Sequence, residues 1–266
     1  MSTVLHPRDM QSSLIDLVTV SNWAKKWQME FNVSKCKIMH FGKRNIGYKY
    51  SMNGHALEEV ATEKDLGVTF SSDLKSATHC KEVYSKANRM LGLISRTIKY
   101  KSPTVLINLY KSLVRPHLDY CSMVWSPHYN KDKLLLERVQ HRFTRLFTHL
   151  RSLPYEDRLS HLGLWSLEER RNRADLIEVF KTVKGLSSNH WSLFFQRAND
   201  SITRGHSWKL LKKNCSTDTR LCFFSQRVIN RWNSLTQEDI DAVSINSFKN
   251  KLEKKRTCQM DFFKDK

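Results

Sequence analysis

The stretch WAKKWQMEFNVSKCKIMHFG, residues 23–42, decides the fold of the first part of this 266-residue chain, because a helical pattern ends in it and a strand pattern begins. Over residues 10–30 the apolar side chains recur at helical spacing, with Val18, Ala24 and Trp27 on one face. This periodicity predicts an amphipathic helix that buries that face.

Short alternating segments follow this helix and predict a small sheet. Residues 35–41 form one expected strand, and Asn53-Gly54 predicts the tight turn of a hairpin, because both residues tolerate positive φ angles. In EKDLGV, residues 63–68, the alternation that begins at Leu66 predicts a further strand. One helix and a small antiparallel sheet are therefore expected, as at the end of an α+β domain.

After about residue 75 the apolar period changes from two residues to 3.6 and stays helical. Capping residues, prolines and glycines place the ends of the helices. We expect helices over residues 76–98, from Ser102-Pro103 to Pro116, from Asn130 onward, from Pro154 to Gly163, from Ser166 to Gly185, and at residues 223–232 and 248–252, with a fraying Lys-rich tail. The predicted fold class is α+β and mostly α, in which the small sheet and its helix are followed by a helical bundle. The expected domains are residues 1–74, 75–128, 129–185 and 186–266.

The charge of the chain is strongly positive and unevenly distributed. Lysine and arginine outnumber acidic residues by 45 to 26, which leaves a formal net charge of +19. Residues 75–115 hold nine basic residues and one acidic one, and residues 202–231 hold seven and one, whereas residues 1–74 are nearly neutral. Cations gathered in stretches are typical of a surface that binds a polyanion, so nucleic acid is the expected partner.

The cysteines and the apolar pattern both indicate an intracellular protein. The six cysteines include no C-x-x-C pair, and three of them lie in apolar periodic segments, as reduced thiols do. No basic-then-apolar signal pattern opens the chain, and no apolar run has the length of a bilayer span. We expect the protein in the nucleus or the cytoplasm, with no membrane partner.

Several motifs together resemble the reverse transcriptases of non-LTR retrotransposons, the jockey-like long interspersed elements. Residues 23–70, with the motifs Asn-x-x-Lys and Leu-Gly-Val, are similar to the end of the palm in that family. The thumb and later regions of the family are similar to KANRMLGLISR (86–96), LYKSLVRPHLDY (109–120), SLEERR (166–171) and FSQRVINRWNSL (224–235). The resemblance covers residues 10–252 in consistent order and implies the back half of a polymerase.

The resemblance also implies which activity is missing. The family's polymerase holds two magnesium ions with two aspartates of an aromatic-x-Asp-Asp hairpin and a third in the palm. This chain contains no Asp-Asp dipeptide, so we expect no polymerase activity from it, no catalytic residue and no cofactor. Lys35 matches the lysine of the Asn-x-x-Lys strand, a candidate proton donor to pyrophosphate in the family. Without the metal site, a solvated strand lysine is the favoured interpretation.

The basic side of the helix expected over residues 76–98 is the candidate nucleic-acid surface. The alternative is an ordinary solvated face, but solvated faces usually mix charge signs, and this one has almost no acidic residues. The arginines at positions 138, 142, 145, 170, 171 and 173 either bind nucleic acid or pair with acidic residues on neighbouring turns. The candidate nucleic-acid-binding residues are Lys81, Lys86, Arg89, Arg96, Lys99, Arg142, Arg145, Arg204, Lys209 and Lys212.

Two features of the later chain have competing interpretations. Trp208 either stacks a base or anchors its segment to the core, and the second is favoured. His206, Cys215 and Cys222 have spacings that match no common zinc site, so no metal site is expected.

Three hypotheses follow for the function. The first is a truncated reverse transcriptase fragment that binds RNA, an RNA–DNA hybrid or DNA through its basic thumb helices without catalysis. The second is the same fragment retained by a host as a nucleic-acid or protein interaction module, and the third is a decayed copy without function. Strong salt dependence of binding favours the first two over the third, and a defined protein partner separates the second from the first. The oligomeric state stays open.

Overall fold

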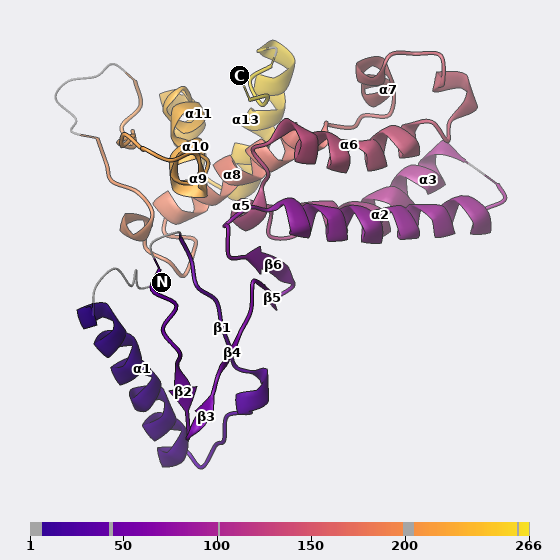
Figure 1. Cartoon of the computed structure of the whole chain (residues 1–266). Helices are drawn as coiled ribbons and strands as arrows, with labels where there is room; N and C mark the ends of the chain where they lie inside the picture. The colour runs from indigo at the N-terminus through magenta and orange to yellow at the C-terminus, as the bar shows by residue number, and fades with distance from the viewer. Residues whose placement is uncertain (1–6, 43–44, 101, 199–204, 260, 266) are drawn as a thin grey trace. The chain divides into compact units, whose positions relative to one another are not determined.

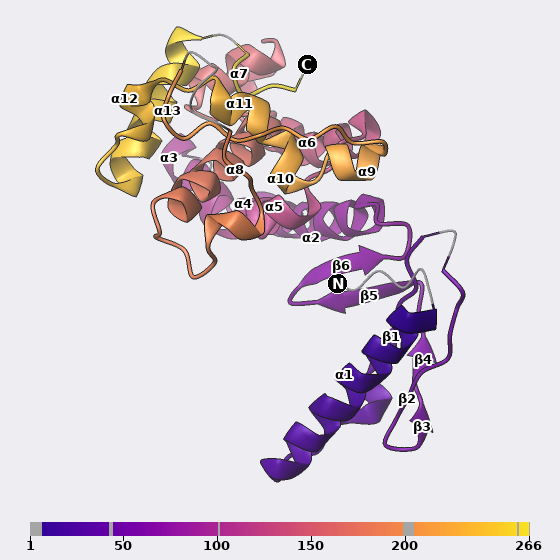
Figure 2. The ribbon, with the colours of Figure 1, turned by 90° about the vertical axis from the view of Figure 1, so that its left-hand side faces the viewer.

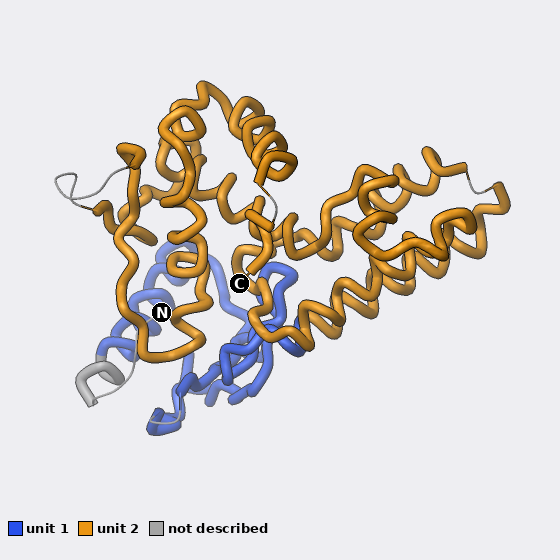
Figure 3. Tube along the Cα trace, turned by 90° about the horizontal axis from the view of Figure 1, so that it is seen from above, with its two compact units in different colours: residues 1–79 blue, residues 80–266 orange. Residues whose placement is uncertain are grey.

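The computed structural model of the chain describes residues 7–42, 45–100, 102–198, 205–259 and 261–265 (Figure 1). The chain divides into two compact units, unit 1 of Met1–His79 and unit 2 of Cys80–Lys266, which Figure 3 shows in different colours. Helices dominate and the strands are few and short, so the expected α+β, mostly α fold is confirmed. Among the described helices, none combines the length and the apolar character that a membrane crossing requires.

Unit 1 contains a long helix, a 3-10 turn and short strands. Its elements are α1 (Pro7–Lys26), η1 (Val33–Lys35), β1 (Lys37–Ile38), β2 (Ser51–Met52), β3 (His55–Ala56), β4 (Glu58–Glu59), β5 (Thr62–Asp65) and β6 (Val68–Ser71). The described strands form three small sheets of two strands each. The β2·β3 and β5·β6 pairs are antiparallel, as expected, while β1 and β4 pair in parallel with Lys37 opposite Glu58.

Two tight turns close the hairpins of unit 1. Asn53 and Gly54 have φ angles of 50° and 80°, which confirms the predicted two-residue hairpin turn. Leu66 and Gly67 have φ angles of 44° and 86° and form a second turn of the same kind between β5 and β6. The prediction that Leu66 belongs to a strand is therefore wrong, and its side chain is 84% exposed.

The segment around Lys35 is a turn where a strand was expected. Lys35 ends the 3-10 turn η1, and β1 begins only at Lys37. The Ser34 hydroxyl donates to the Asn32 side-chain oxygen at 2.6 Å, and the Cys36 N–H donates to the Val33 carbonyl at 3.0 Å. These local hydrogen bonds compete with strand pairing and hold the tight turn.

The apolar face predicted for the first helix is only partly buried in α1. Ala24 is buried, whereas the side chains of Val18 and Trp27 are 59% and 61% exposed. The helix itself matches the periodicity, because it ends at Lys26 within the predicted span. Periodicity therefore located the helix, but it did not show how much of the apolar face is covered.

The regular elements of unit 2 are helices and helical turns, joined by loops and an isolated antiparallel bridge between Arg197 and Leu210 (Figure 2). Its elements are α2 (Ala77–Thr97, which begins in unit 1), α3 (Pro103–Leu109), the π-helical turn η2 (Tyr110–Val114), α4 (Arg115–Asp119), α5 (Ser122–Trp125), α6 (Asn130–Thr144), η3 (Thr148–Leu150), α7 (Tyr155–His161), α8 (Leu167–Val183), η4 (Trp191–Leu193), α9 (Asp218–Leu221), α10 (Phe224–Arg227), α11 (Ile229–Asn233), α12 (Gln237–Ile240) and α13 (Ile245–Cys258).

Most helix ends of unit 2 follow their sequence signals. The Ser166 hydroxyl accepts from the Glu169 N–H at 3.2 Å, and the Glu169 carboxylate accepts from the Ser166 N–H at 2.8 Å, which confirms the predicted capping box of α8. Gly163 and Gly185 follow α7 and α8 with φ angles of 58° and 67°. Asn130 is the first residue of α6 and not its cap, because Tyr129 occupies that position without a side-chain hydrogen bond.

Pro116 was expected to end the helix that starts at Pro103, but it does not. The chain passes from α3 through the π-helical turn η2 into α4, where Pro116 lies in the first turn. The Arg115 N–H donates to the Tyr110 carbonyl, five residues back. A proline clashes with the carbonyl four residues before it in an α-helix, and the wider π turn relieves that clash.

The core of unit 2 gathers the later helices and the end of the described chain. Its most deeply buried members include Leu176, Phe180, Val228, Trp232, Phe248 and Leu252. Phe263 is buried in the same core, and the carboxylate of Asp265 accepts from Lys133 at 2.5 Å and from Arg231 at 3.0 Å. Residues 261–265 are therefore docked, and the expected fraying of the tail is wrong for them.

Candidate nucleic-acid interface

The inner face of α2 fixes which of its side chains point outward. Val83, Ala87, Leu91 and Ile94 are all buried, and their spacing of three or four residues forms one continuous stripe. The expected helix over residues 76–98 matches the observed Ala77–Thr97 within one residue at each end. The opposite side of α2 therefore lies at the surface.

That outer side is basic, as the sequence predicted. Lys81, Arg89, Arg96 and Lys99 are exposed, with Lys99 placed two residues beyond the end of α2. We call these four residues and Arg142 the basic face. Among the described residues, no carboxylate lies within ion-pair distance of the four. An uncompensated row of cations is the arrangement that a polyanion backbone requires.

Lys86 differs from the other lysines of α2. It is half-buried, and its Nζ lies 3.8 Å from Glu82 in an ion pair across one helical turn. This pairing compensates its charge, as an ordinary solvated helix face would. Lys86 therefore does not belong to the basic face, although the sequence placed it at the margin.

Arg142 of α6 joins the basic face by crossing over α2, and the two helices run side by side in Figures 1 and 2. Its Nη1 donates to the Asn88 side-chain oxygen at 3.2 Å. Its Nη2 lies 3.7 Å from the place that a Cβ would take on Gly92, which is ordinary van der Waals contact, so the guanidinium lies directly over this glycine. Asn88 and Gly92 are the residues that sequence reasoning missed, although helical periodicity does place both on the outer side of α2.

The other arginines considered from the sequence divide into two groups. Arg145 is exposed at the end of α6, and its carbonyl accepts from the Arg151 Nε at 2.8 Å. Arg170 pairs with Asp119 at 2.5 Å, Arg171 is buried, and Arg173 donates to the Lys249 carbonyl at 3.2 Å. The last three serve the interior of unit 2, while Arg145 stays available to a ligand.

The cations of the segment 205–213 are less available than the sequence suggested. Lys209 is half-buried, and its side chain packs over Gly205, where a Cβ would meet its Cε at 2.3 Å. Lys212 is exposed, and Arg204 lies outside the described residues. Trp208 packs against the core and its carbonyl accepts from the Trp232 Nε1 at 2.7 Å, so it anchors the segment.

Both ring nitrogens of the buried His206 contact backbone groups. Its Nε2 contacts the Trp232 carbonyl at 3.1 Å, and its Nδ1 accepts from the Trp208 N–H at 3.2 Å. Burial, the largest influence, lowers the pKa of this imidazole. Both ring nitrogens are used within the core, which leaves neither for a ligand.

The donor set of the described residues does not fit the magnesium pair of a polymerase. Within the described ranges, no group of three or more His, Cys, Asp or Glu side chains is placed to hold a metal ion. Such a pair of ions requires convergent carboxylates, which the described residues do not bring together. Lys35 is exposed on the turn η1 and belongs to no such group.

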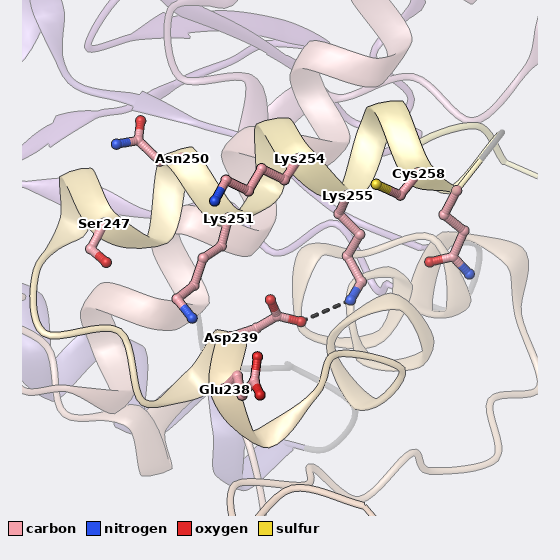
Figure 4. A pocket seen from close by; sticks show the side chains of 9 residues that line it. Glu238, Asp239, Ser247, Asn250, Lys251, Lys254, Lys255 and Cys258 are labelled. Atoms are coloured by element: carbon pink, nitrogen blue, oxygen red, sulfur yellow. Dashed lines mark hydrogen bonds and ion pairs between the residues drawn. The ribbon is translucent and has the colours of Figure 1, made fainter.

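A second collection of lysines lines a hollow between α12 and α13 (Figure 4). Lys251, Lys254 and Lys255 of α13 line it together with Glu238 and Asp239 of α12, and the Lys255 Nζ lies 2.8 Å from the Asp239 carboxylate. Asp239 also accepts from the Thr236 N–H at 2.9 Å and so caps α12. Because charges of both signs alternate in this hollow, it suits a polyanion less well than the basic face does.

Comparisons with known proteins identify no relative of this chain. No protein-family model matches it, and no curated protein or solved structure matches it. The candidate interface therefore rests on its own geometry and on the resemblance of the sequence motifs.

Proposed function

We propose that this chain binds RNA or an RNA–DNA hybrid through the basic face, as the thumb of a non-LTR retrotransposon reverse transcriptase would, and that it does not itself polymerise DNA. The observation that carries the proposal is the row of exposed, unpaired cations on α2, extended by Arg142. The resemblance of KANRMLGLISR, residues 86–96, to the family's thumb supports the same conclusion.

The dimensions of the basic face suit a nucleic-acid backbone. From Lys81 to Arg96 the axis of α2 extends about 22 Å, at about 1.5 Å per residue. That length follows about six nucleotide steps of one strand of a duplex. Cations held at fixed spacing on a rigid helix release condensed counterions from such a backbone, which makes the binding steeply dependent on salt.

The distribution of carboxylates supports the proposal that the chain does not polymerise DNA. The chain contains no Asp-Asp dipeptide, and its described residues form no carboxylate group that would hold two metal ions. The proposed role of the polypeptide is therefore to grip nucleic acid. Under this proposal Lys35 is a solvated lysine.

The test compares two fourfold alanine variants of the intact chain. The first removes Lys81, Arg89, Arg96 and Lys99, and the control removes four cations of unit 2 outside the basic face that have no ion pair in the described structure: Lys131, Lys184, Lys251 and Lys254. Both variants lose the same charge. Affinity for a fluorescent RNA–DNA hybrid is measured over a salt series.

We expect the first variant to lower the slope of log affinity against log salt by about 3 to 4, and the control to change it by less than about 1. If the slope falls equally in both variants, the binding depends only on net charge, and the basic face is rejected as a site. No binding by the wild-type chain at low salt would favour a decayed copy without function.

A protein interaction module is the second candidate, favoured by α1. Val18, Trp23 and Trp27 expose large apolar surfaces, although isolated exposed apolar residues are common. If these residues form a contact surface between copies of the chain, V18S/W27S will lower the mass measured by light scattering. If the wild-type chain and V18S/W27S both have the mass of a monomer, that role is contradicted.

A further inference from the structure

A pocket of about 380 Å³ opens at the surface of unit 2, and none of its lining residues belongs to α2, the helix that carries the main proposal. Three segments line it: the turn η4 with the residues after it, residues 211–213, and the short helices α9 to α11. Its volume lies in the range of pockets that hold a small organic ligand such as a nucleotide.

A buried amide with no partner lies in the wall of this pocket. Gln226 is only 3% exposed, and its Oε1 has no hydrogen-bond partner in the described structure. Gln140, the comparable buried glutamine, accepts from Tyr110 at 2.8 Å and donates to the Trp165 carbonyl at 2.9 Å. A buried polar group without a partner is unusual and requires an explanation, of which a missing ligand is one.

Aromatic rings form another part of the wall. Trp191 is half-buried and meets Trp208 edge to face with ring centroids 5.8 Å apart, which fixes its orientation. Phe194 is 39% exposed and is held by a tilted contact with Phe195 and an edge-to-face contact with Phe224. Rings that are fixed at the edge and partly open are suited to stacking against a flat ligand.

The charge around the pocket is positive. Lys213 and Arg220 line it and are exposed, and neither forms an ion pair with a described residue. Arg197 also lines the pocket, but its guanidinium donates to the Ser207 carbonyl at 2.9 Å and lies over Trp208. Among the described lining residues there is no carboxylate, so the ligand is expected to carry negative charge.

We propose that this pocket receives one unstacked base of a single-stranded nucleic acid. The base stacks on Phe194, its hydrogen-bonding edge pairs with the Gln226 amide, and Lys213 and Arg220 contact the flanking phosphates. An amide offers one acceptor and one donor side by side, which matches a base edge that presents a donor beside an acceptor, as adenine does. Exposed aromatic rings with an amide and cations are the combination that reads unpaired bases.

This site goes beyond the proposed function and does not depend on it. The basic face follows a backbone and ignores the bases, whereas the pocket requires a base that is free of its partner strand. A chain with both sites would hold a duplex on α2 and an adjoining unpaired nucleotide in the pocket. Each site can fail in experiment without the other.

The first test measures the intact chain with two single-stranded probes of equal length, oligoadenylate and the same sugar–phosphate backbone without bases. We expect wild-type protein to prefer oligoadenylate by about tenfold, since stacking and an amide contact together are worth at least that ratio. Adenosine 5′-monophosphate should compete and ribose 5-phosphate should not. Equal affinity for the two oligonucleotides would overturn the proposal.

The second test uses Q226L, which removes the amide at nearly constant volume. Because the amide has no partner, we expect the melting temperature to stay the same or rise, while the preference for oligoadenylate falls about tenfold. K254A, a lysine change on α13, should leave the preference intact. An unchanged preference in Q226L would mean that Gln226 is only an unsatisfied core residue.

If Q226L does not fold, F194S and K213A decide the question, because both residues are on the surface. F194S should lose the preference for the base, and K213A should weaken both probes alike. If neither variant shows its expected effect, the proposal is overturned. A salt slope that still depends on Lys81, Arg89, Arg96 and Lys99 would then leave the proposed function standing.

Discussion

The guanidinium of Arg142 on α6 lies on the surface of α2, where its Nη1 donates to the Asn88 side-chain oxygen at 3.2 Å. Two helices far apart in the sequence thereby contribute to one row of cations. The guanidinium also lies over Gly92 of α2, with its Nη2 3.7 Å from the place that a Cβ would take there. The basic face is therefore a property of the packing between two helices as well as of one helix.

Removing the Arg142 side chain tests this arrangement. We expect R142A to lower the salt slope of hybrid binding by about 1, because one phosphate contact is lost. N88A keeps every charge and should reduce affinity less than R142A does, without changing the slope. R138A, an exposed arginine on the same helix, is the control. If R138A and R142A behave alike, the position over α2 has no special role.

The capping box of α8 supports the core of unit 2, so its loss should be measurable. Ser166 satisfies the N–H of Glu169, and the Glu169 carboxylate also accepts from the Arg256 Nε at 3.1 Å. We expect S166A to cost about 1 kcal/mol of unfolding free energy. Denaturant unfolding checks this value, with S160A on α7 as an exposed control. A loss no larger than that of S160A would show that the cap is dispensable.

Acid should destabilise the fold through His206. Burial first, and then the nearby Lys209, lower the pKa of this histidine in the folded state, although the contact with the Trp232 carbonyl opposes the shift. The unfolded chain then takes up the proton first as the pH falls. The stability that neutral His206 contributes is fully present above about pH 6.5, the pKa of a histidine in the unfolded chain. It is lost as the pH falls toward the lower pKa of the folded state.

Melting temperatures between neutral and mildly acidic pH measure this loss. We expect the melting temperature of H206Q to be lower at neutral pH and to depend less on pH. His141 shifts in the same direction because of burial and the neighbouring Arg158, so part of the dependence will persist. H161Q, an exposed control, should keep the full dependence. An equal pH dependence in wild type and H206Q would contradict the assignment.

The contacts of Asp265 should hold the end of the described chain against the core. Burial would raise the pKa of its carboxyl, but Lys133 and Arg231 together hold that pKa below its usual range. We expect D265N to speed hydrogen exchange over residues 261–265, and wild-type protein to show the same loosening only below about pH 4. D261N, which removes only an exposed pair with Lys264, should change little.

Local signals in the sequence were enough for much of the fold. The ends of α2, the capping box at Ser166 and the turn at Asn53-Gly54 were predicted because each depends on residues within one or two turns. The docking of Asp265 onto Lys133 joins residues 132 positions apart, and no local pattern reports it. The turn at Leu66 was missed because its alternation with later apolar residues continues the pattern of a strand.

The candidate site divides in the same way. Helical periodicity placed Lys81, Arg89 and Arg96 on one exposed side, and the structure agrees. The packing of Lys209 over Gly205 and the orphaned amide of Gln226 arise from segments that meet only in three dimensions. Composition predicts the sign of the charge on the expected partner, and the structure shows which cations are exposed on the surface.

The π-helical turn η2 changes the direction in which later side chains point in the long helical run from Pro103 to Asp119. Leu106 and Leu118 are both fully buried although they are 12 positions apart, and in a continuous α-helix they would point about 120° away from each other. The turn absorbs one residue, which reduces the angular difference to about 20°. Deleting a single residue between 110 and 114 would convert the turn into regular α-helix and would leave Leu118 within about 20° of Leu106, still facing the core.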